Sequence, residues 1–287
     1  LGALDAGGAL TDHGRRMSRL PLSPRLAHMT AAASDAGDAM TGARVAAILS
    51  EPGLGGASTD LVDRLNALER DRSPRARDAL KLADRWARAA GGGKGGAPDP
   101  AVLLAQAFPE RIARARGKPG EFLLAAGRGA ALEATDHLAR ETWLAVGELG
   151  GGEARDRIRL AARLDGALIE TDFARLIEVE ERLVREPSGR AMIRRIRKIG
   201  ALVIGEKTLG AADPARMASL LKAEVEADGL GALKWGEQAK ALRARLAFLH
   251  ALDDIWPDVS DQGLLKTRED WLWPLLDGVA SLTAIGD

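Results

Sequence analysis

The sequence predicts an α+β protein of several domains, in which helices come first, a small β domain follows and helices return towards the end. A residue that can cap a helix stands directly before proline at four places, which is a common start of a helix. Apolar residues recur at helical spacing before residue 90 and after residue 213. Between these regions the apolar runs are short and interrupted by glycine, as in a small barrel or sandwich. The four helix starts are Ser23-Pro24, Ser73-Pro74, Asp99-Pro100 and Asp213-Pro214.

Residues 10–29 read LTDHGRRMSRLPLSPRLAHM and predict two helices joined by a tight turn. Thr11 is suited to cap the first helix through its hydroxyl oxygen. Pro21 cannot continue that helix, because proline has no backbone N–H to donate. Ser23 and Pro24 then begin the second helix.

Apolar stripes at helical spacing between residues 24 and 90 predict core helices. They comprise Val45, Ile48 and Leu49, then Leu61, Val62, Leu65 and Leu68, and then Leu80, Ala83 and Trp86. The stretch GGGKGGAP at 91–98 is a flexible linker or long loop by composition. It does not match a phosphate-binding P-loop, because Lys94 is followed by Gly95 and no strand precedes it.

The middle of the chain predicts short strands. Residues 111–133 hold two runs separated by the turn signal Lys118-Pro119-Gly120. Residues 141–165 indicate a further strand pair around three consecutive glycines. Residues 172–184 are ambiguous between helix and strand. Residues 189–209 are ambiguous too, since isoleucines at helical spacing precede the strand-like run GALVIGE.

The tail from Asp213 to about Leu282 predicts helices again. One apolar face comprises Met217, Leu220 and Leu221, and another comprises Leu242, Leu246, Phe248 and Leu249. Four of the six tryptophans lie here, at positions 235, 256, 271 and 273. Clustered tryptophans of this kind usually pack in a core, and an interface role is the alternative.

Composition limits the classes of function. The 287 residues include 41 basic and 41 acidic ones, so the formal net charge is zero and nucleic-acid binding would need a local basic patch. No apolar run approaches the roughly 18–20 residues that span a bilayer. No secretory signal is visible at the beginning of the chain. We therefore expect no membrane partner and a cytoplasmic location, with which the absence of cysteine agrees.

No catalytic constellation stands out. The four histidines, His13, His28, His137 and His250, lack the H-x-x-x-H and H-E-x-x-H spacings of zinc sites. The G-x-S-x-G elbow of a nucleophilic serine does not occur. The residues alone therefore predict a binding or positioning module without a metal or cofactor of its own.

Residues 1–29 resemble the segment that follows the motor domains of DEAH-box RNA helicases, whose pattern is L-G-A-L-[DN]-x-x-G-x-L-T-x-x-G-x-x-M-x-x-[LF]-P-[LV]-x-P-x-L-[AS]-x-M. The matching residues are Leu1, Gly2, Ala3, Leu4, Asp5, Gly8, Leu10, Thr11, Gly14, Met17, Leu20, Pro21, Leu22, Pro24, Leu26, Ala27 and Met29. Later stretches narrow the resemblance to the bacterial HrpB type and extend it over essentially the whole chain. These stretches are FPERIARARG, FLLAAGRGAAL, RIRLAARLD, IGALVIGEKTL and WPDVSDQGLLKTREDWLWPLLDGV.

The resemblance implies four consecutive parts. We expect the end of a winged helix at residues 1–23, a helical bundle with a ratchet role at 24–105, an OB-like β domain at 106–210 and a helical extension at 211–287. The resemblance also favours strands for 189–209, which periodicity leaves open.

In the family, two RecA-like motor domains hydrolyse ATP and come before the winged helix. This chain begins at Leu1 and has no counterpart of the P-loop, the DEAH box or the arginine fingers. We therefore expect it to be part of a longer polypeptide, which the resemblance implies is an ATP-driven 3′→5′ RNA translocase. ATP and magnesium belong to that parent protein by resemblance. We expect no ATP hydrolysis by this chain alone.

Basic side chains on the predicted β domain are the candidate contacts for single-stranded RNA, with DNA as an alternative. The domain offers few aromatic residues for base stacking, namely Phe122, Trp143 and Phe173. We therefore expect arginines to contact the nucleic-acid backbone without base readout. For each cation the alternative is a solvated position or an internal salt bridge. The candidates are Arg111, Arg114, Arg116, Lys118, Arg128, Arg194, Arg195, Arg197 and Lys198.

A second group of arginines flanks the turn at Pro21 and comprises candidate contacts to the motor domains. These residues are Arg15, Arg16, Arg19 and Arg25. A function of another class also fits the sequence, namely a protein-interaction scaffold that docks through the Trp-rich C-terminal helices. The zero net charge and the scarcity of aromatic residues in the β domain favour this alternative.

Overall fold

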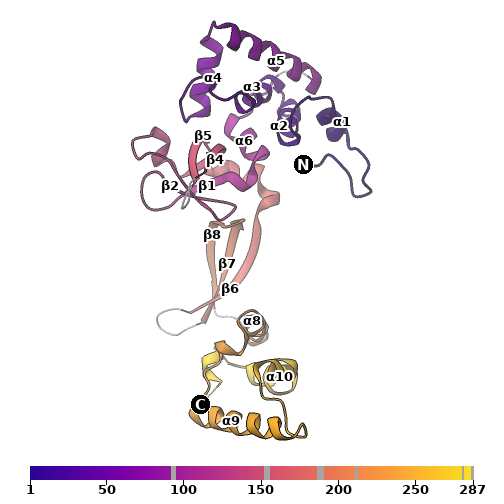
Figure 1. The fold of residues 1–287 in the computed structure, drawn as a ribbon, viewed down its shortest axis with the longest axis vertical. Coiled ribbons are helices and arrows are strands. Elements are labelled where there is room, and N and C mark those ends of the chain that lie inside the picture. Colours follow the sequence, from indigo (N-terminus) through magenta and orange to yellow (C-terminus); the bar gives the residue numbers. More distant parts are fainter. Residues whose placement is uncertain (92–94, 152–155, 186–190, 211–212, 280, 286–287) are drawn as a thin grey trace. The chain divides into compact units, whose positions relative to one another are not determined.

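The computed structural model describes residues 1–91, 95–151, 156–185, 191–210, 213–279 and 281–285, which form two compact units (Figure 1). Unit 1 contains Leu1–Glu178 and Lys198–Val203, and unit 2 contains Val179–Arg197 and Ile204–Asp287. The fold is α+β as predicted, with helices, a closed β-barrel and further helices in chain order. The four predicted domain boundaries stay predictions.

Helices open unit 1, and α1 and α5 begin at predicted caps, whereas Ser23 precedes α2 without a side-chain cap hydrogen bond. The Thr11 hydroxyl accepts a hydrogen bond from Gly14 N, and the Ser73 hydroxyl accepts one from Ala76 N. The helices of this region span Asp12–Ser18 (α1), Pro24–Asp35 (α2), Ala39–Ser50 (α3), Leu61–Arg70 (α4), Pro74–Ala90 (α5) and Pro100–Ala107 (α6).

The predicted apolar stripes bury most of their members. Val45, Ile48 and Trp86 lie in the core, whereas Val62 is exposed on α4. Helix α3 packs closely on α2 because Gly42 has no side chain, and a Cβ at that position would lie 2.6 Å from the Cβ of Ala33. The small residue at the crossing therefore sets the distance between these two helices.

Five short strands form a closed barrel after α6, in the order β1-β2-β3-β5-β4. All neighbouring pairs are antiparallel except β3 and β5, which are parallel. The strands span Ile112–Ala115 (β1), Glu121–Leu124 (β2), Gly129–Ala131 (β3), Trp143–Gly150 (β4) and Asp156–Arg163 (β5). The barrel interior is filled by apolar side chains, including Phe122, Leu124, Leu144, Val146 and Ile158.

The strand pair predicted at 141–165 is confirmed as β4 and β5. The second run predicted within 111–133 is instead two strands, β2 and β3. The chain turns between them at Gly127, whose φ of 85° is a conformation that side chains with a Cβ rarely adopt. A short apolar run with glycines does not reveal by itself whether it continues straight or folds back.

Helix α6 joins the helical region to the barrel and is apolar on almost every side. It packs against α2 and also against β4, and six of its eight residues are buried. Gly147 lies at an irregularity of the β4 pairing, where a Cβ would stand 3.0 Å from Leu49 Cδ2 and 3.2 Å from Leu104 Cδ1. The helices therefore lie directly on the strand backbone at this point.

A second connection runs from the beginning of α4 to strand β5. Ala161 N donates to Thr59 O at 2.8 Å. The buried Arg64 guanidinium donates to Ser58 O at 2.5 Å and to Arg159 O at 3.1 Å. A buried charge is tolerated here because two carbonyl oxygens satisfy it.

The chain continues from the barrel through a short helix, α7 (Gly166–Asp172), to three more strands. The ambiguous segments 172–184 and 189–209 overlap the strands Glu178–Arg185 (β6), Ala191–Ile199 (β7) and Leu202–Gly210 (β8). These three strands form a separate sheet in the order β6-β7-β8, outside the barrel. The sequence did not predict this division of the strands between two sheets.

Unit 1 also contains three short 3₁₀ helices in its described residues. They span Pro109–Arg111 (η1), His137–Arg140 (η2) and Ala174–Leu176 (η3).

Unit 2 has a core of its own around α8. Buried members include Met217, Leu221 and Leu272. Trp235, Trp271 and Trp273 pack against this core, as expected for clustered tryptophans. The helical elements span Pro214–Asp228 (α8), Gly229–Ala232 (η4), Glu237–Leu252 (α9), Asp261–Lys266 (α10), Arg268–Trp271 (α11), Trp273–Leu276 (η5) and Leu282–Ala284 (η6).

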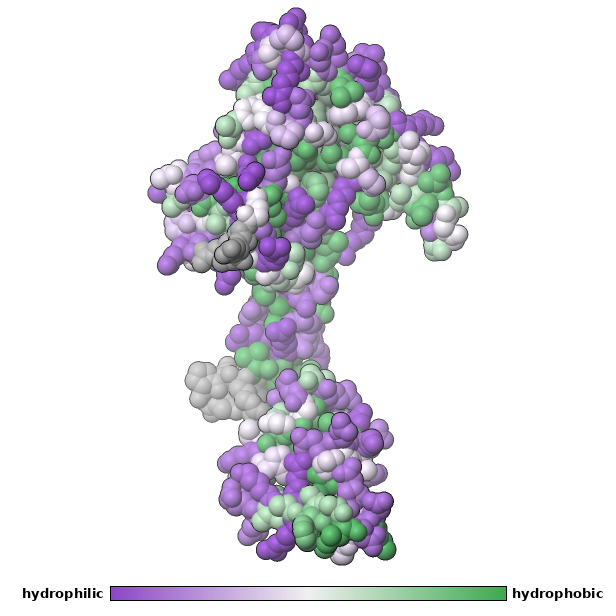
Figure 2. All heavy atoms as spheres, in the orientation of Figure 1, coloured by the Kyte–Doolittle hydropathy of each residue, from purple (hydrophilic) through white to green (hydrophobic). Residues whose placement is uncertain are grey.

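The apolar face predicted on α9 is not part of this core. No residue of α9 is buried, and Leu242 and Phe248 expose 58% and 66% of their surface. The predicted helix is therefore confirmed as α9, but its apolar side chains are not packed in the core of unit 2. Figure 2 shows apolar side chains gathered over α9.

The contact at Gly147 gives a test of the fold. We expect Gly147→Val to lower the stability of unit 1 by about 1–3 kcal/mol, because the added methyl groups must displace Leu49 and Leu104. Urea denaturation followed by circular dichroism measures this change. The control is Gly205→Val in β8, where a Cβ would meet no atom within 4 Å. Equal midpoints for the two variants would contradict the account.

Candidate nucleic-acid interface

The turn between β1 and β2 carries two of the predicted cations, Arg116 and Lys118. Both side chains are exposed, and neither makes an ion pair or a side-chain hydrogen bond in the described part of the chain. The turn itself is ordered by backbone hydrogen bonds, since Lys118 N donates to Arg116 O at 2.6 Å and Glu121 N donates to Lys118 O at 3.1 Å. Two cations without internal partners therefore stand on a defined turn.

A third free cation, Arg140, belongs to the same end of the barrel. Gly120 N donates to Ala139 O at 2.8 Å, which ties the β1–β2 turn to η2. Arg140 ends η2, is exposed and has no side-chain partner among the described residues. We call Arg116, Lys118 and Arg140 the basic rim. No sequence pattern indicates Arg140, because its nearness to the turn depends on a contact between residues about twenty positions apart.

Two other predicted cations, Arg25 and Arg111, meet around Phe108. Their guanidinium carbons lie 5.5 Å and 4.4 Å from the Phe108 ring centroid. Arg25 also pairs with Glu110 at 2.7 Å, and Arg111 donates to Gly147 O at 2.6 Å. Both side chains thus hold the junction of helices and barrel together.

Arg114 and Arg128 are also engaged within unit 1. Arg114 donates to Val203 O, and its guanidinium carbon lies 5.3 Å from the centroid of the Trp143 ring. Arg128 pairs with the buried Asp156 at 3.1 Å, although its own side chain is largely exposed.

The predicted cations of β7 do not form one patch. Arg194 pairs with Glu206 on β8 at 3.3 Å, and Arg195 pairs with Glu181 on β6 at 3.0 Å. Lys198 pairs with Glu178 at 3.5 Å, and Arg197 is half-buried. The three ion pairs join neighbouring strands of the β6-β7-β8 sheet. This matches the alternative that these cations form internal salt bridges.

Of the arginines around the Pro21 turn, only Arg19 makes neither an ion pair nor a side-chain hydrogen bond in the described chain, and its side chain is exposed. Arg15 pairs with Asp12 at 2.6 Å, and Arg16 pairs with Asp35 at 2.7 Å. Whether any of this group contacts motor domains stays a prediction.

The aromatic residues near the barrel are not arranged for base stacking. Phe122 and Phe173 are buried. Trp143 is half-buried, and Arg114 lies over its ring. None of these three rings is therefore fully exposed for a base to stack on.

Asp60, Asp63 and His137 place their ligand atoms within 4.8 Å of one another, the only such cluster found among the described residues. His137 Nε2 lies 2.8 Å from Asp60 Oδ2, and the Ser58 hydroxyl donates to Asp63 at 3.0 Å. The hydrogen bond that His137 donates to the Asp60 carboxylate raises the pKa of His137. These contacts link α4 to η2, and we assign no metal to them.

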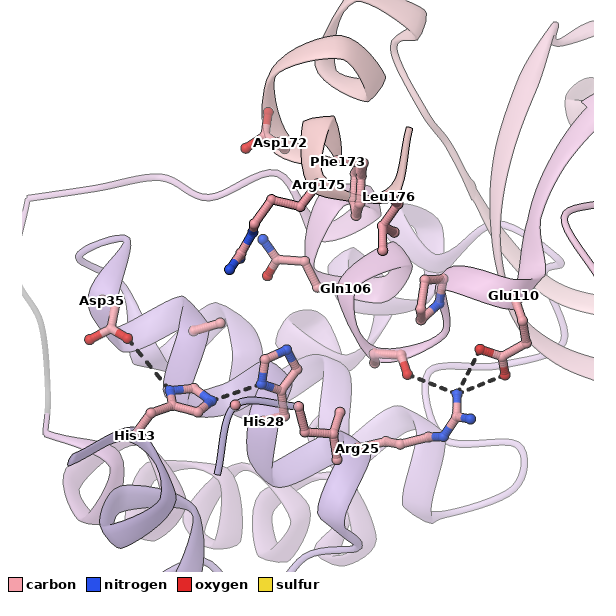
Figure 3. A pocket seen from close by; sticks show the side chains of 15 residues that line it. His13, Arg25, His28, Asp35, Gln106, Glu110, Asp172, Phe173, Arg175 and Leu176 are labelled. Atoms are coloured by element: carbon pink, nitrogen blue, oxygen red, sulfur yellow. Dashed lines mark hydrogen bonds and ion pairs between the residues drawn. The ribbon is translucent and has the colours of Figure 1, made fainter. Parts of the chain in front are cut away.

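Unit 1 also contains a cavity of about 780 Å³, bounded by α1, α2, α6 and η3 (Figure 3). His13 Nε2 lies 2.7 Å from His28 Nδ1 at its wall. Arg175 lines the cavity without a partner among the described residues, and the Gln106 side-chain oxygen is buried without one. The cavity lining thus combines the Arg175 guanidinium with the His13 and His28 imidazoles. We assign no ligand to this cavity.

The chain matches known proteins along almost its whole length. Residues 1–22 match the model of the helicase associated domain (HA2), winged-helix. Over 99% of its length the chain is 34% identical to the ATP-dependent RNA helicase HrpB of Escherichia coli K12. The crystal structure of the E. coli DExH-box NTPase HrpB matches with a TM-score of 0.67 at 31% identity, over 99% of this chain. A second crystal structure, of the Escherichia coli DEAH/RHA helicase HrpB, matches with a TM-score of 0.66 at 30% identity, over 98% of this chain.

These matches define the chain as a region of a DEAH-box helicase. The helicase is of the HrpB type, and the chain corresponds to its C-terminal part. The chain spans 35% of the length of the HrpB proteins it matches. Among the described helices, none combines the length and apolar character needed to cross a membrane.

The histidine pair gives a pH-dependent prediction. Burial, and secondarily His13 beside it, lowers the pKa of His28 to about 4, whereas an unfolded histidine has a pKa of about 6.5. Between these values the unfolded chain binds more protons than the folded chain, so the stability of unit 1 falls as the pH falls from about 6.5 to about 4. The slope is at most about 1.4 kcal/mol per pH unit, and solvent screening reduces it.

Urea denaturation at several pH values between 7 and 4 measures this slope. We expect His28→Leu to reduce the loss of stability on acidification, with part remaining from His13, whose pKa is also lowered by burial. His250→Gln in unit 2 is the control. An unchanged acid slope in His28→Leu would show that His28 is not held neutral.

Proposed function

We propose that this chain is an accessory module of an ATP-dependent RNA helicase and guides single-stranded RNA by contacts with its backbone. The observation that carries the proposal is the basic rim, where Arg116, Lys118 and Arg140 stand on ordered backbone without internal partners. Most other predicted cations of the barrel are engaged in ion pairs or carbonyl contacts. With a net charge of zero, attraction of RNA must come from such a local set.

The strand order supports an OB-like description of the barrel. OB-folds are five-stranded Greek-key barrels that bind oligonucleotides on strands 2 and 3 and on the loops that follow strands 1 and 4. The basic rim includes the connection after β1, which corresponds to the first of these loops. In this proposal the barrel presents the rim to a passing strand.

Backbone contact explains the residue types at the rim. Arginine can bind a phosphate through two parallel N–H donors, and lysine acts as a compact charge. Such contacts do not read sequence, so the module would accept RNA of any sequence, and DNA would compete. A translocating enzyme needs this tolerance because every base of the strand passes the same site.

The chemical step belongs to the rest of the helicase in this proposal. ATP and magnesium would bind the RecA-like motor domains of the same polypeptide, which contact this module, and the chain alone would not hydrolyse ATP. The location of the protein is proposed to be cytoplasmic.

Salt dependence of RNA binding tests the proposal. We expect the variant Arg116→Gln/Lys118→Gln/Arg140→Gln to bind a single-stranded oligonucleotide more weakly. Its slope of log affinity against log salt should be shallower by about 2, since each phosphate contact contributes about 0.7. Fluorescence anisotropy at several salt concentrations measures both quantities.

The matched control is Arg70→Gln/Arg72→Gln/Arg77→Gln, which changes the net charge equally at exposed arginines without a side-chain partner in the described chain. We expect this variant to keep most of the affinity and slope. If both variants lost the same RNA affinity and salt slope, the change in net charge alone would explain the loss. That result would contradict the role of the rim.

A second function, a protein-interaction scaffold, is favoured by the exposed apolar side chains of α9. It would act through unit 2. A pull-down with and without residues 237–256 separates it from RNA binding, because loss of RNA affinity alone would contradict the scaffold.

A further inference from the structure

The start of α4 and the start of η2 exchange hydrogen bonds between their capping regions. Asp60 caps α4 and Asp136 caps η2, each by accepting a hydrogen bond from a backbone N–H of its own element. Each capping carboxylate also accepts a hydrogen bond from the other element. The Thr59 hydroxyl donates to Asp136, and His137 Nε2 donates to Asp60 at 2.8 Å. We call Thr59, Asp60, Asp136 and His137 the clasp.

The two carboxylates of the clasp are shielded from solvent. The side chains of Asp60 and Asp136 expose 14% and 13% of their surface. Hydrogen bonds to an ionised acceptor are roughly twice as strong as those between neutral groups. A shielded acceptor that loses its donor is also costly to the fold. The clasp therefore holds η2 against the start of α4 more firmly than a fully exposed polar contact would.

The α4 side of the clasp is itself fixed to the barrel. Thr59 O accepts a hydrogen bond from Ala161 N on β5 at 2.8 Å. Arg64, in the first turn of α4, donates to Arg159 O on β5 at 3.1 Å. Thr59 thus joins β5 through its backbone and η2 through its hydroxyl, so the clasp connects η2 to an anchored part of the helical region.

The opposite end of η2 belongs to the basic rim. Ala139 O accepts from Gly120 N at 2.8 Å, and Arg140 is the last residue of η2. Gly120 is buried, and a Cβ at this position would lie 2.5 Å from Leu132 O, so the β1–β2 turn lies tightly against the chain before η2. With the rise of about 2.0 Å per residue of a 3₁₀ helix, the two ends of η2 are only about 6 Å apart.

We propose that the clasp positions the basic rim for RNA, with Thr59 and His137 as the positioning residues. The inference rests on the proposed function, because it names what holds the RNA-binding cations in place. The clasp fixes the first residue of η2, and η2 carries this position to Arg140 and, through Gly120, to the β1–β2 turn. Cations on a loosened segment must be ordered when they bind phosphate, which costs affinity. A displacement of α4 would therefore change the RNA affinity of a surface that α4 does not itself form.

Variants of the clasp in the full 287-residue chain test this role through RNA affinity. Thr59→Val removes the hydroxyl that reaches Asp136, and we expect binding of a single-stranded RNA oligonucleotide to weaken about threefold or more. Thr59→Ser keeps the hydroxyl and should retain the original affinity. His137→Leu should also weaken binding, whereas His137→Gln keeps an N–H donor and should retain most of the affinity. Fluorescence anisotropy measures these affinities.

The matched control is Thr41→Val in α3. Thr41 is half-buried like Thr59, and its hydroxyl donates to Asp38, the cap of its own helix. We expect this variant to bind RNA like the original chain. Circular dichroism shows whether each variant is folded at the assay temperature. Should Thr59→Val fail to fold, His137→Leu carries the comparison, because the His137 side chain is 59% exposed.

Amide hydrogen exchange of Gly120, measured by NMR without RNA, reports on the rim directly. We expect this exchange to be about tenfold faster in Thr59→Val than in Thr41→Val, because the clasp no longer holds η2 and its bond to Gly120 opens more often. Equal exchange in the two folded variants would overturn the inference.

The RNA measurements separate this inference from the proposed function. If the triple variant of the rim weakens RNA binding and the clasp variants do not, the clasp has no positioning role and the proposed function stands. If the triple variant binds RNA normally, the proposed function fails and the role of the clasp in RNA binding fails with it.

Discussion

The arrangement of unit 1 depends on the burial of α6 between α2 and strand β4. Its leucines contact the helices on one side and the barrel on the other, and each buried leucine contributes about 1.5–3 kcal/mol. Gly147 permits this approach, because a side chain there would meet Leu49 and Leu104. The carbonyl oxygens at the junction then need donors, which Arg25 provides at Ala107 O and Arg111 at Gly147 O.

The cations of this chain fall into two groups. Some arginines have partners inside the fold and stabilise it, whereas others have no internal partner among the described residues. Around Phe108 and along β7, guanidinium groups have carboxylate or carbonyl partners, and removing them would weaken the fold before it affected any ligand. The basic rim has no such internal role. Its cations stand on backbone that is fixed by the connection between Gly120 and Ala139, so substituting them should cost the fold little stability. The chain is neutral overall, and in the proposed function this local difference gives the barrel one side that can attract phosphate.

Local chemistry in the sequence predicted much of the fold and only part of the site. Caps such as Thr11 and Ser73 act within three residues, so their helices could be placed correctly. The division of β2 from β3, the separate sheet of β6–β8 and the exposure of α9 depend on partners distant in sequence, which periodicity does not reveal. Arg116 and Lys118 were predicted from a visible basic turn. Arg140 was missed because only a long-range hydrogen bond brings η2 to that turn.

Photo-crosslinking of single-stranded RNA containing 4-thiouridine, with mass-spectrometric mapping of the linked peptides, tests the central claim most directly. The account predicts crosslinks in peptides that contain residues 116–121 and 137–142, the two segments that form the rim. It also predicts the same positions for RNAs of unrelated sequence, because phosphate contacts fix the strand without reading bases. Crosslinks confined to unit 2 or to helices α2–α5, with none in the two rim segments, would contradict the account.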